Sequence, residues 1–505
     1  MDRSRVVDAK PATPPRSFTI ALWAIAIGWA ILQRPFGFGL QPYLFFDSGW
    51  ALTTDELLRD GLVPTCDFAY FYGLLTLVVD RAWFAVFGAT PFAQGGLCLV
   101  CAAAATHAVW RFAAAAALGF GARGLLLACA PLAIMPSFYS TPVHALEHAL
   151  LINALAYQAK GRLPISLALA TVALFVKPAL AAVYGLILLG FILFGRRDPE
   201  VKILRRLRDL IPAAVTGLGV TCMLVANFGI EPLVATLVPL EAAKLYAAEN
   251  YGFFFGIGRN FWLPIGPEAT YYPLRPGPFW VAGTIILTWR AARDLRKERT
   301  PLTWLASTCV ALHLAFTCLF FGNAYSWQYY PYPLIFGLCL VLNRGAPADR
   351  GTILGVGALA ILGQSLVFLM TLAMLLRSAA APGEERSAAT SGLLASREDQ
   401  ESWTRVRALA VADTVLVLSN VGAAHAVMPE VASPRSWFLL RPVARPAEIE
   451  RLRDQLASAN WLVIPTGPGD KLTTWPELAD QLRNFQIVEE HASFVLARRI
   501  RPAPR

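Results

Sequence analysis

Long apolar runs separated by short polar segments make up most of residues 1–376. A helix needs roughly 17–25 residues of this kind to cross the hydrocarbon core of a bilayer. Runs of about this length lie at 18–35, 93–110, 122–140, 143–159, 163–176, 178–195, 209–228, 277–292, 301–322, 331–344 and 351–376, of which the fifth and tenth are the shortest. The pattern therefore predicts a polytopic α-helical membrane protein with about 11 transmembrane helices.

One of the longest apolar stretches is interrupted by a charged residue next to a proline, Lys177–Pro178. A proline removes a backbone donor and disfavours the helical conformation of the residue before it. We interpret this pair as a break between two spans.

Residues 70–88 are apolar but carry Asp80 and Arg81 in their middle. Charges there are expensive in a span that faces lipid, so we predict an amphipathic helix that lies at the membrane interface.

Basic residues test this choice, because the cytoplasmic loops of membrane proteins are rich in Lys and Arg. With 70–88 at the interface, the segments predicted inside all contain basic residues: the N-terminus, 111–123, 160–162, 196–208, 290–299 and 344–350. Counting 70–88 as a span would place one set of these clusters outside. We therefore predict a cytoplasmic N-terminus, with the loop 36–92, residues 229–276 and 323–330, and the chain after 376 on the exterior.

The chain changes character at about residue 377, after which a polar linker of small residues, 378–392, precedes alternating short elements. Residues 413–420 and 460–467 have the composition of buried strands, as does a terminal pair at 485–490 and 492–500. Residues 446–460 and 473–485 have the pattern of amphipathic helices, the second opened by a capping box of Thr474 and Glu477. The sequence thus predicts two domains: 1–376 in the membrane, and 377–505 as a small extracytoplasmic α/β domain.

Composition supports a membrane protein, since 56% of the residues are hydrophobic and only 15% are charged. The net charge of +10 does not indicate a nucleic-acid partner, because the basic residues lie in short clusters between apolar runs. Cys98 and Cys101 form a C-x-x-C pair, but no second pair or histidine follows at zinc spacing. The cysteines predict neither a disulfide framework nor a structural zinc site.

Acidic and aromatic residues gather in the first predicted external loop, between Asp47 and Gly73. Its acids are Asp47, Asp55, Glu56, Asp60 and Asp67. Turn-forming Gly61 and Pro64 punctuate it, and Trp50 and Tyr72 are among its aromatics. We expect the chemistry of a membrane enzyme to lie here.

The order of residues in this loop resembles a known family. Asp47, Gly49 and Trp50 are followed by Gly61, Pro64, Asp67, Tyr72–Gly73 and a terminal Trp83–Gly88 segment; further on come Leu174–Pro178 and Gln328–Pro333. This series is similar to that of the GT-C glycosyltransferases, in particular the protein O-mannosyltransferase and aminoarabinose transferase type. Asp47–Ser48 replaces the Asp-Glu pair of that family, and Gln94 stands where an Arg is common.

The resemblance implies a GT-C-like membrane fold and transfer of a sugar, with inversion, from a polyprenyl-phosphate donor at the extracytoplasmic face of a bacterial inner membrane. The acceptor would be a lipid, a glycan or a protein. Asp47 would be the general base that removes the acceptor's proton. Lys177, Arg259 and Arg275 would stabilise the leaving phosphate. Asp67, Trp50, Tyr72, Tyr329 and Tyr330 would contact the substrates.

A cofactor is not certain from the sequence, although a divalent metal ion has candidate ligands. His144, Glu147 and His148 follow one another at i, i+3 and i+4 on one helix face. Two histidines and a carboxylate at this spacing are a weak metal pattern. The alternative is a hydrogen-bonded cluster at the external membrane boundary.

Several of these residues have simpler interpretations. Asp47 is also a favoured helix N-cap residue, and Asp67 is a turn-former beside Pro64. Asp55 and Glu56 have the pattern of a solvated helix face. Lys177 could extend to the interface for its charge alone, and the tyrosines at 325–332 are typical of an interfacial aromatic belt.

Two other functions remain open at this stage. A transporter or flippase of lipid-linked saccharides would have inverted repeats and broken helices in matched halves, whereas this sequence has one break and no repeat. A non-catalytic envelope-assembly protein would use the first loop to bind a partner.

Overall fold

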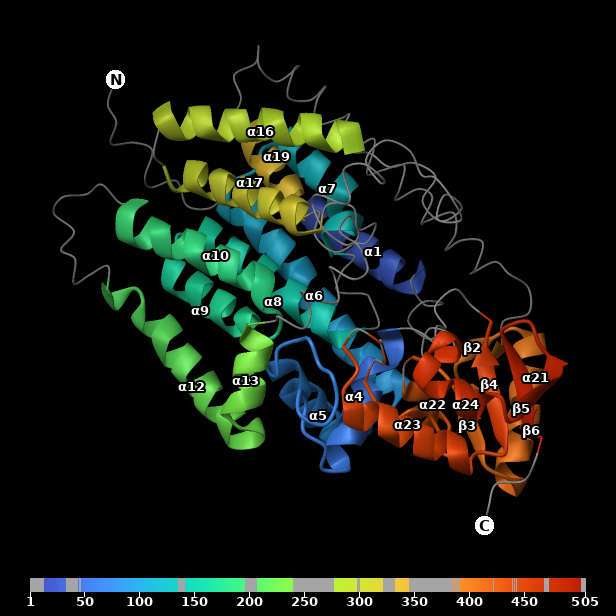
Figure 1. Ribbon diagram of the computed structural model, residues 1–505. Coiled ribbons are helices and arrows are strands. Elements are labelled where there is room, and N and C mark those ends of the chain that lie inside the picture. The colour runs from blue at the N-terminus through green and yellow to red at the C-terminus, as the bar shows by residue number, and fades with distance from the viewer. Residues whose placement is uncertain are drawn as a thin grey trace, which may run out of the picture.

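The computed structural model describes most of the predicted helices and strands. The described residues are 13–32, 44, 47–134, 141–195, 207–238, 277–297, 300–320, 332–344, 385–386, 390–420, 422–437, 439, 441, 443–466 and 472–500. Figure 1 shows an assembly of long helices beside a smaller α/β unit that contains the end of the chain.

The apolar runs form helices. These are α1 (Arg16–Leu32), α6 (Pro91–Ala115), α7 (Phe120–Ile134), α8 (Pro142–Ala159), α9 (Leu163–Leu174), α10 (Pro178–Gly190), α12 (Ile211–Phe228), α16 (Gly277–Lys297), α17 (Pro301–Phe320) and α19 (Tyr332–Arg344). A π-helical turn, Phe191–Gly195, continues α10. Each predicted run from 18–35 to 331–344 therefore contains a helix, and the last predicted run, 351–376, lies outside the described residues.

Prolines begin several of these helices. Pro91, Pro142 and Pro178 each occupy the first turn of α6, α8 and α10. The first turn tolerates proline because its N–H groups have no partner within the helix. Before α6, the Thr90 hydroxyl also accepts a hydrogen bond from the Ala93 N–H at 3.1 Å and caps the helix.

The described helices differ in length and in hydropathy. Pro91–Ala115 and Ile211–Phe228 are long and apolar enough on their own to cross a membrane. Leu163–Leu174 and Tyr332–Asn343 are among the apolar helices of 10–17 residues. The number of spans therefore stays a prediction.

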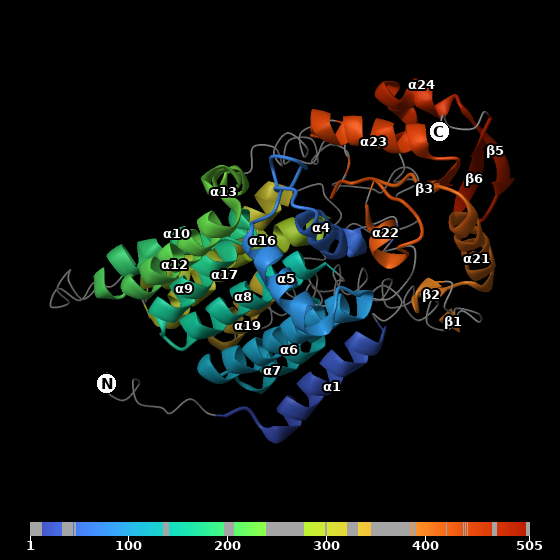
Figure 2. The same cartoon turned by 90° about the horizontal axis from the view of Figure 1, so that it is seen from below.

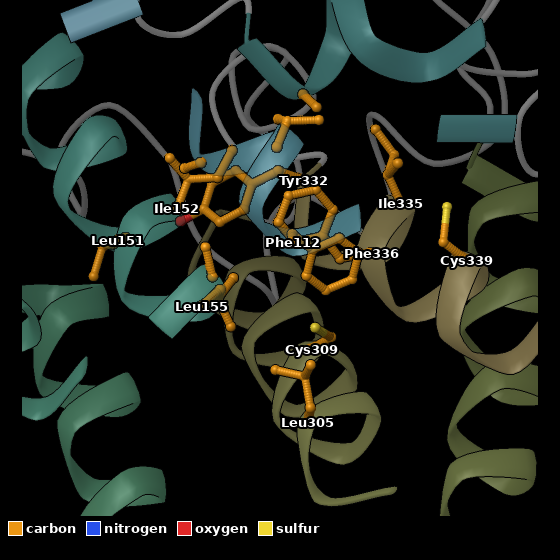
Figure 3. Close-up of a cluster of buried hydrophobic side chains, with 14 of the residues drawn as sticks. Phe112, Leu151, Ile152, Leu155, Leu305, Cys309, Tyr332, Ile335, Phe336 and Cys339 are labelled. Carbon is orange, nitrogen blue, oxygen red and sulfur yellow. The ribbon is translucent and has the colours of Figure 1, made fainter. Parts of the chain in front are cut away.

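The helices pack around a core to which α6, α8, α17 and α19 all contribute. Ile152 and Leu155 of α8 belong to this cluster together with Leu305 and Cys309 of α17 (Figure 3). Phe112 of α6 stacks on Phe336 of α19, with ring centroids 4.0 Å apart. Ala102, Ala105 and Ala108 are fully buried along α6, and their small side chains let neighbouring helices approach closely.

The loop after α1 contains two helices of its own. A 3-10 turn, Asp47–Gly49, leads directly into α4 (Trp50–Arg59), and α5 (Leu75–Phe87) follows. The predicted helix over 70–88 is thus present as α5. A short helix that we did not predict, α13 (Ile230–Leu237), follows α12.

The C-terminal part contains a four-stranded sheet in the order β3-β4-β6-β5. Its strands are β3 (Val415–Val417), β4 (Trp461–Pro465), β5 (Phe485–Glu490) and β6 (Phe494–Arg499). β3 and β4 are parallel, with α23 (Pro446–Ser458) between them in the sequence, and β6 pairs antiparallel with both β4 and β5. The predicted strands and the first predicted helix are confirmed.

Three details of this part differ from the prediction. Residues 473–485 do not form one helix: they contain two 3-10 turns, Leu472–Thr474 and Pro476–Leu478, and the four-residue α24 (Ala479–Leu482). The Glu477 carboxylate accepts hydrogen bonds from Arg441 instead of closing a capping box. β1 (Glu385–Arg386), in the predicted linker, pairs with β2 (Leu394–Ala395) just after it, and α21 (Arg397–Ala412) was not predicted.

The first loop and the C-terminal part share a hydrophobic core. Ala51 and Leu52 of α4 pack in one cluster with Trp403, Val415 and Phe494. In both views α4 lies beside the short helix α22 (Ala423–Val427) of the C-terminal part (Figures 1 and 2). The two segments, more than 300 residues apart in sequence, therefore form one continuous structure.

Candidate functional site

Lys177 lies at the helix break between α9 and α10. Its backbone is extended, with φ −153° and ψ 106°, because the following Pro178 disfavours a helical conformation. The side chain is buried. Its Nζ lies 3.2 Å from His144 Nδ1 and 3.8 Å from a carboxylate oxygen of Glu147, both on α8. The predicted break is confirmed, and it brings a cation to the start of a helix.

The end of the first loop is bound to this break through its backbone. The Gly73 N–H donates to the Val176 carbonyl at 2.9 Å, and the Leu75 N–H donates to the Phe175 carbonyl at 3.1 Å. A Cβ atom on Gly73 would lie 1.9 Å from the Phe175 carbonyl oxygen. Only glycine fits this approach, so Gly73 sets the distance between the loop and Lys177.

Tyr72 connects the loop to the cationic residue. Its hydroxyl lies 3.4 Å from His144 Nε2, and Lys177 Nζ lies 5.6 Å from the centre of its ring. A cation at this distance from an aromatic face is attracted by the ring. The predicted site residues Tyr72 and Lys177 are therefore neighbours.

The residues proposed as metal ligands point to different partners. His144 lies between Tyr72 and Lys177, whereas the His148 ring packs edge-on against Tyr332 at 5.0 Å. No group of three His, Cys, Asp or Glu side chains in the described part of the chain is arranged to hold a metal ion. The contacts of His144 and Glu147 with Lys177 correspond to the hydrogen-bonded alternative.

Aromatic rings line the loop side of this cluster. Trp50 lies 5.7 Å from Tyr72 between ring centroids, and both contact Trp437 from the C-terminal part, at 4.8 Å and 5.6 Å. Trp50 is buried in these contacts, and Tyr72 is half-buried. Sequence reasoning missed Trp437, because nothing in its local pattern indicates a partner so far away in the chain.

Asp47 is the first residue of the 3-10 turn that precedes α4. Contacts of Ser48 and Trp50 show which parts of the structure lie next to this turn. The buried side chain of Gln94, near the start of α6, donates to the Ser48 carbonyl. Three residues after Asp47, Trp50 contacts Tyr72. The N-cap position of α4 is Gly49, so the interpretation of Asp47 as the N-cap of this helix was wrong.

Asp55 does not lie on a solvated face, contrary to the sequence interpretation. Its side chain is buried and pairs with Arg59 at 2.5 Å. Burial raises the pKa of this carboxyl, and the arginine only partly opposes the shift. The reason is tertiary: α5, α6 and α22 all pack against α4. Glu56 is half-buried, and one carboxylate oxygen lies 3.4 Å from His425 Nε2.

Asp67 closes the turn at Pro64. Its carboxylate accepts a hydrogen bond from the Val63 N–H at 2.7 Å, and its carbonyl accepts one from the Arg451 side chain at 2.6 Å. This is the turn-forming role weighed for it above. Its contact with an acceptor stays a prediction, and Arg259, Arg275, Tyr329 and Tyr330 lie outside the described residues.

Comparison with known proteins identifies the fold. No family model and no curated protein matches the sequence. The structure is similar to the crystal structure of ArnT from Cupriavidus metallidurans bound to undecaprenyl phosphate. The similarity covers 97% of this chain and 100% of that chain, with a TM-score of 0.54 and 13% sequence identity. ArnT is a GT-C aminoarabinose transferase. The chain thus has the GT-C-type fold expected from its motifs, while function has to be argued from the site.

Proposed function

We propose that the protein is an integral membrane glycosyltransferase. It moves a sugar, with inversion, from a polyprenyl-phosphate donor to an acceptor at the extracytoplasmic face. The observation that carries this proposal is the position of Lys177. In a fold shared with a protein bound to undecaprenyl phosphate, a buried cation lies at the start of α10, beside the acidic first loop.

Lys177 is suited to the phosphate of the donor for two reasons. An ammonium group forms strong, charge-assisted hydrogen bonds with phosphate oxygens. The start of a helix also favours an anion, because its backbone N–H groups and its dipole are directed toward it. Glu147 and Tyr72 hold the ammonium between them at 3.8 Å and 5.6 Å, so it is oriented before a ligand binds.

Asp47 serves as the general base. Its carboxylate takes the proton of the acceptor hydroxyl as the oxygen attacks C1 of the sugar from the face opposite the phosphate. The C1–O bond to phosphate breaks, and polyprenyl phosphate leaves with the bonding electron pair. Lys177 stabilises the charge that develops on the leaving group. Attack from the opposite face inverts C1.

The proposal is tested by mass spectrometry of envelope glycans, lipids and proteins from a deletion strain. We expect one glycan, lipid or protein mass to lose a sugar increment and the wild-type gene to restore it. Asp47→Asn and Asp47→Ala should each lower restoration by about 10²–10⁴-fold in rate, since the hydroxyl would lose its proton acceptor. Asp60→Asn is the matched control, because this carboxylate lies in the same loop, is partly exposed and pairs with Arg435.

Binding of undecaprenyl phosphate to the purified full-length chain tests Lys177 separately. Lys177→Met should weaken binding by about ten- to a hundredfold, the loss expected for one hydrogen bond to a charged group.

Full restoration by a correctly inserted Asp47→Asn protein would show that Asp47 is not the base. Envelope glycans, lipids and proteins that are all unchanged in the deletion strain would refute the glycosyltransferase.

A further inference from the structure

Trp437, from the C-terminal part, lies among aromatic rings of the first loop. It is 2% exposed. Its ring centroid lies 4.8 Å from Trp50, 4.9 Å from Tyr70, 5.3 Å from Phe71 and 5.6 Å from Tyr72. A tryptophan in contact with four rings restricts all of them, because each has little room to change rotamer in a packed interior.

Glu448 on α23 fixes this arrangement, because it forms hydrogen bonds both to the first loop and to the segment that contains Trp437. One carboxylate oxygen accepts from the Ala69 N–H of the first loop at 3.2 Å and from the Arg445 N–H at 2.8 Å. The other oxygen accepts from the hydroxyl of Ser436, the residue before Trp437. Glu448 is 2% exposed, so these bonds are shielded from water. It therefore ties the backbone before Tyr70 to the backbone that carries Trp437.

The contacts continue from Trp437 to the proposed phosphate site. Trp437 packs edge-on against Tyr72, the Tyr72 hydroxyl reaches His144, and His144 lies 3.2 Å from Lys177. Tyr72 itself is half-buried, so Trp437 and Trp50 supply much of the packing that holds its ring.

We propose that Trp437 is a positioning residue for the phosphate site, and that the C-terminal domain completes this site through it. Trp437 does not touch the substrate. It holds Tyr72 so that His144 and Lys177 keep the geometry in which the ammonium meets a phosphate. This inference rests on the proposed role of Lys177 as the phosphate-binding group. Small displacements of a binding group cost large factors in affinity or rate, so a supporting residue of this kind has a measurable effect.

The test compares two buried tryptophans of the C-terminal domain in the purified full-length protein. Trp437→Leu removes the contacts with the first loop. Trp475→Leu is the matched control, since Trp475 is 4% exposed and, in the described part of the chain, belongs to a hydrophobic cluster made up of residues of the C-terminal domain. Undecaprenyl phosphate is the probe, and its dissociation constant is measured well below the unfolding temperature of each variant.

We expect Trp437→Leu to weaken binding by roughly tenfold, Trp475→Leu to leave it unchanged, and Trp437→Phe to restore most of the affinity. A loss of affinity that is merely structural would affect both leucine variants alike. Hydrogen exchange of a peptide covering 68–75 gives a second measurement. Trp437→Leu should speed exchange there, because the Ala69, Gly73 and Leu75 amides are all hydrogen-bonded across the site.

Equal affinities of Trp437→Leu and Trp475→Leu, with Lys177→Met weakened, would overturn the positioning role but leave the phosphate site standing. Unchanged affinity in Lys177→Met would overturn the phosphate site and this inference with it.

Discussion

Asp80 is a charged residue of the helix predicted to lie at the membrane interface, yet its side chain is buried. It is 3% exposed on α5, and one of its carboxylate oxygens has no hydrogen-bond partner in the described part of the chain. Burial, and to a lesser extent the negative charge of Asp55, raises the pKa of Asp80 well above its ordinary value. Its neighbour Arg81 is exposed, so α5 buries one of its two charged residues and leaves the other in contact with the surroundings.

The pH dependence of stability follows from the direction of this shift. A carboxyl whose folded-state pKa is raised contributes stability below its unfolded value, and this contribution is lost as pH rises through the folded pKa. Asp80→Asn cannot ionise, so it should match the wild type at about pH 4 and be more stable by about 1–3 kcal/mol once Asp80 is ionised. Thermal unfolding in detergent, followed from about pH 4 upward, measures the difference in stability between Asp80→Asn and the wild type.

The exposed Asp480 provides the control for this measurement, since its carboxylate is 92% exposed. Asp480→Asn should change stability little, as expected for an exposed surface position. A constant difference between Asp80→Asn and the wild type would contradict the ionisation argument.

At the scale of elements, the end of the first loop packs against the break between α9 and α10. Neither α9 nor α10 would by itself hold Tyr72 near Lys177. The fit comes from two backbone hydrogen bonds and from the missing side chain of Gly73. Because the approach is between backbone atoms, no rotation of a side chain can relieve a clash there.

Gly73→Ala tests this fit. The added Cβ would force the loop away from Phe175, and we expect a loss of about 1–3 kcal/mol in stability, as in other overpacked interiors. It should also weaken binding of undecaprenyl phosphate, because Tyr72 moves with its neighbour.

Gly185→Ala on α10 is the matched control, because nothing lies within 4 Å of a Cβ placed there. It should be neutral or stabilising by about 0.5–1 kcal/mol, as expected for alanine in place of glycine within a helix. If both variants unfold at the wild-type temperature, the close approach at Gly73 is not important for stability.

At the scale of the whole molecule, the first loop belongs structurally with the end of the chain. Arg435 pairs with Asp60, the Ser419 hydroxyl donates to the Leu44 carbonyl at 3.1 Å, and the two regions share a hydrophobic core. Segments that share a core lie on the same side of a membrane. The predicted external location of the loop therefore requires an external location for the C-terminal domain.

Cys66 allows this topology to be measured, since it is exposed in the first loop. We expect a membrane-impermeant maleimide to label wild-type spheroplasts more strongly than a Cys66→Ser variant. In the Cys66→Ser background, Lys160→Cys, in the predicted cytoplasmic turn between α8 and α9, should react only after permeabilisation. Labelling of Cys66 only after permeabilisation would reverse the predicted orientation.

Local patterns were sufficient for much of the fold. Apolar runs predicted α1, α6 to α10, α12, α16, α17 and α19, and the Lys177–Pro178 pair predicted the break between α9 and α10. Short β-branched runs predicted the strands of the C-terminal sheet. These features depend on backbone conformations and burial preferences of neighbouring residues, which act over a few positions of the chain.

Residues 473–485 show the limit of such patterns. The spacing of apolar residues there is helical, yet the segment folds into short turns, and Glu477 bonds with Arg441. Asp55 shows the same limit. Its position in a helical pattern predicted a solvated side chain, but three other helices bury it.

The sequence by itself therefore determined most of the helices, the break at Lys177 and which loop is acidic. Only the tertiary structure decided which groups meet: Lys177 with His144 and Tyr72, and Tyr72 with Trp437. The physical reason is that a helix or a turn is selected by interactions between near neighbours. The contact of Trp437 with the first loop depends instead on packing between segments that are far apart in the chain, which no local pattern records.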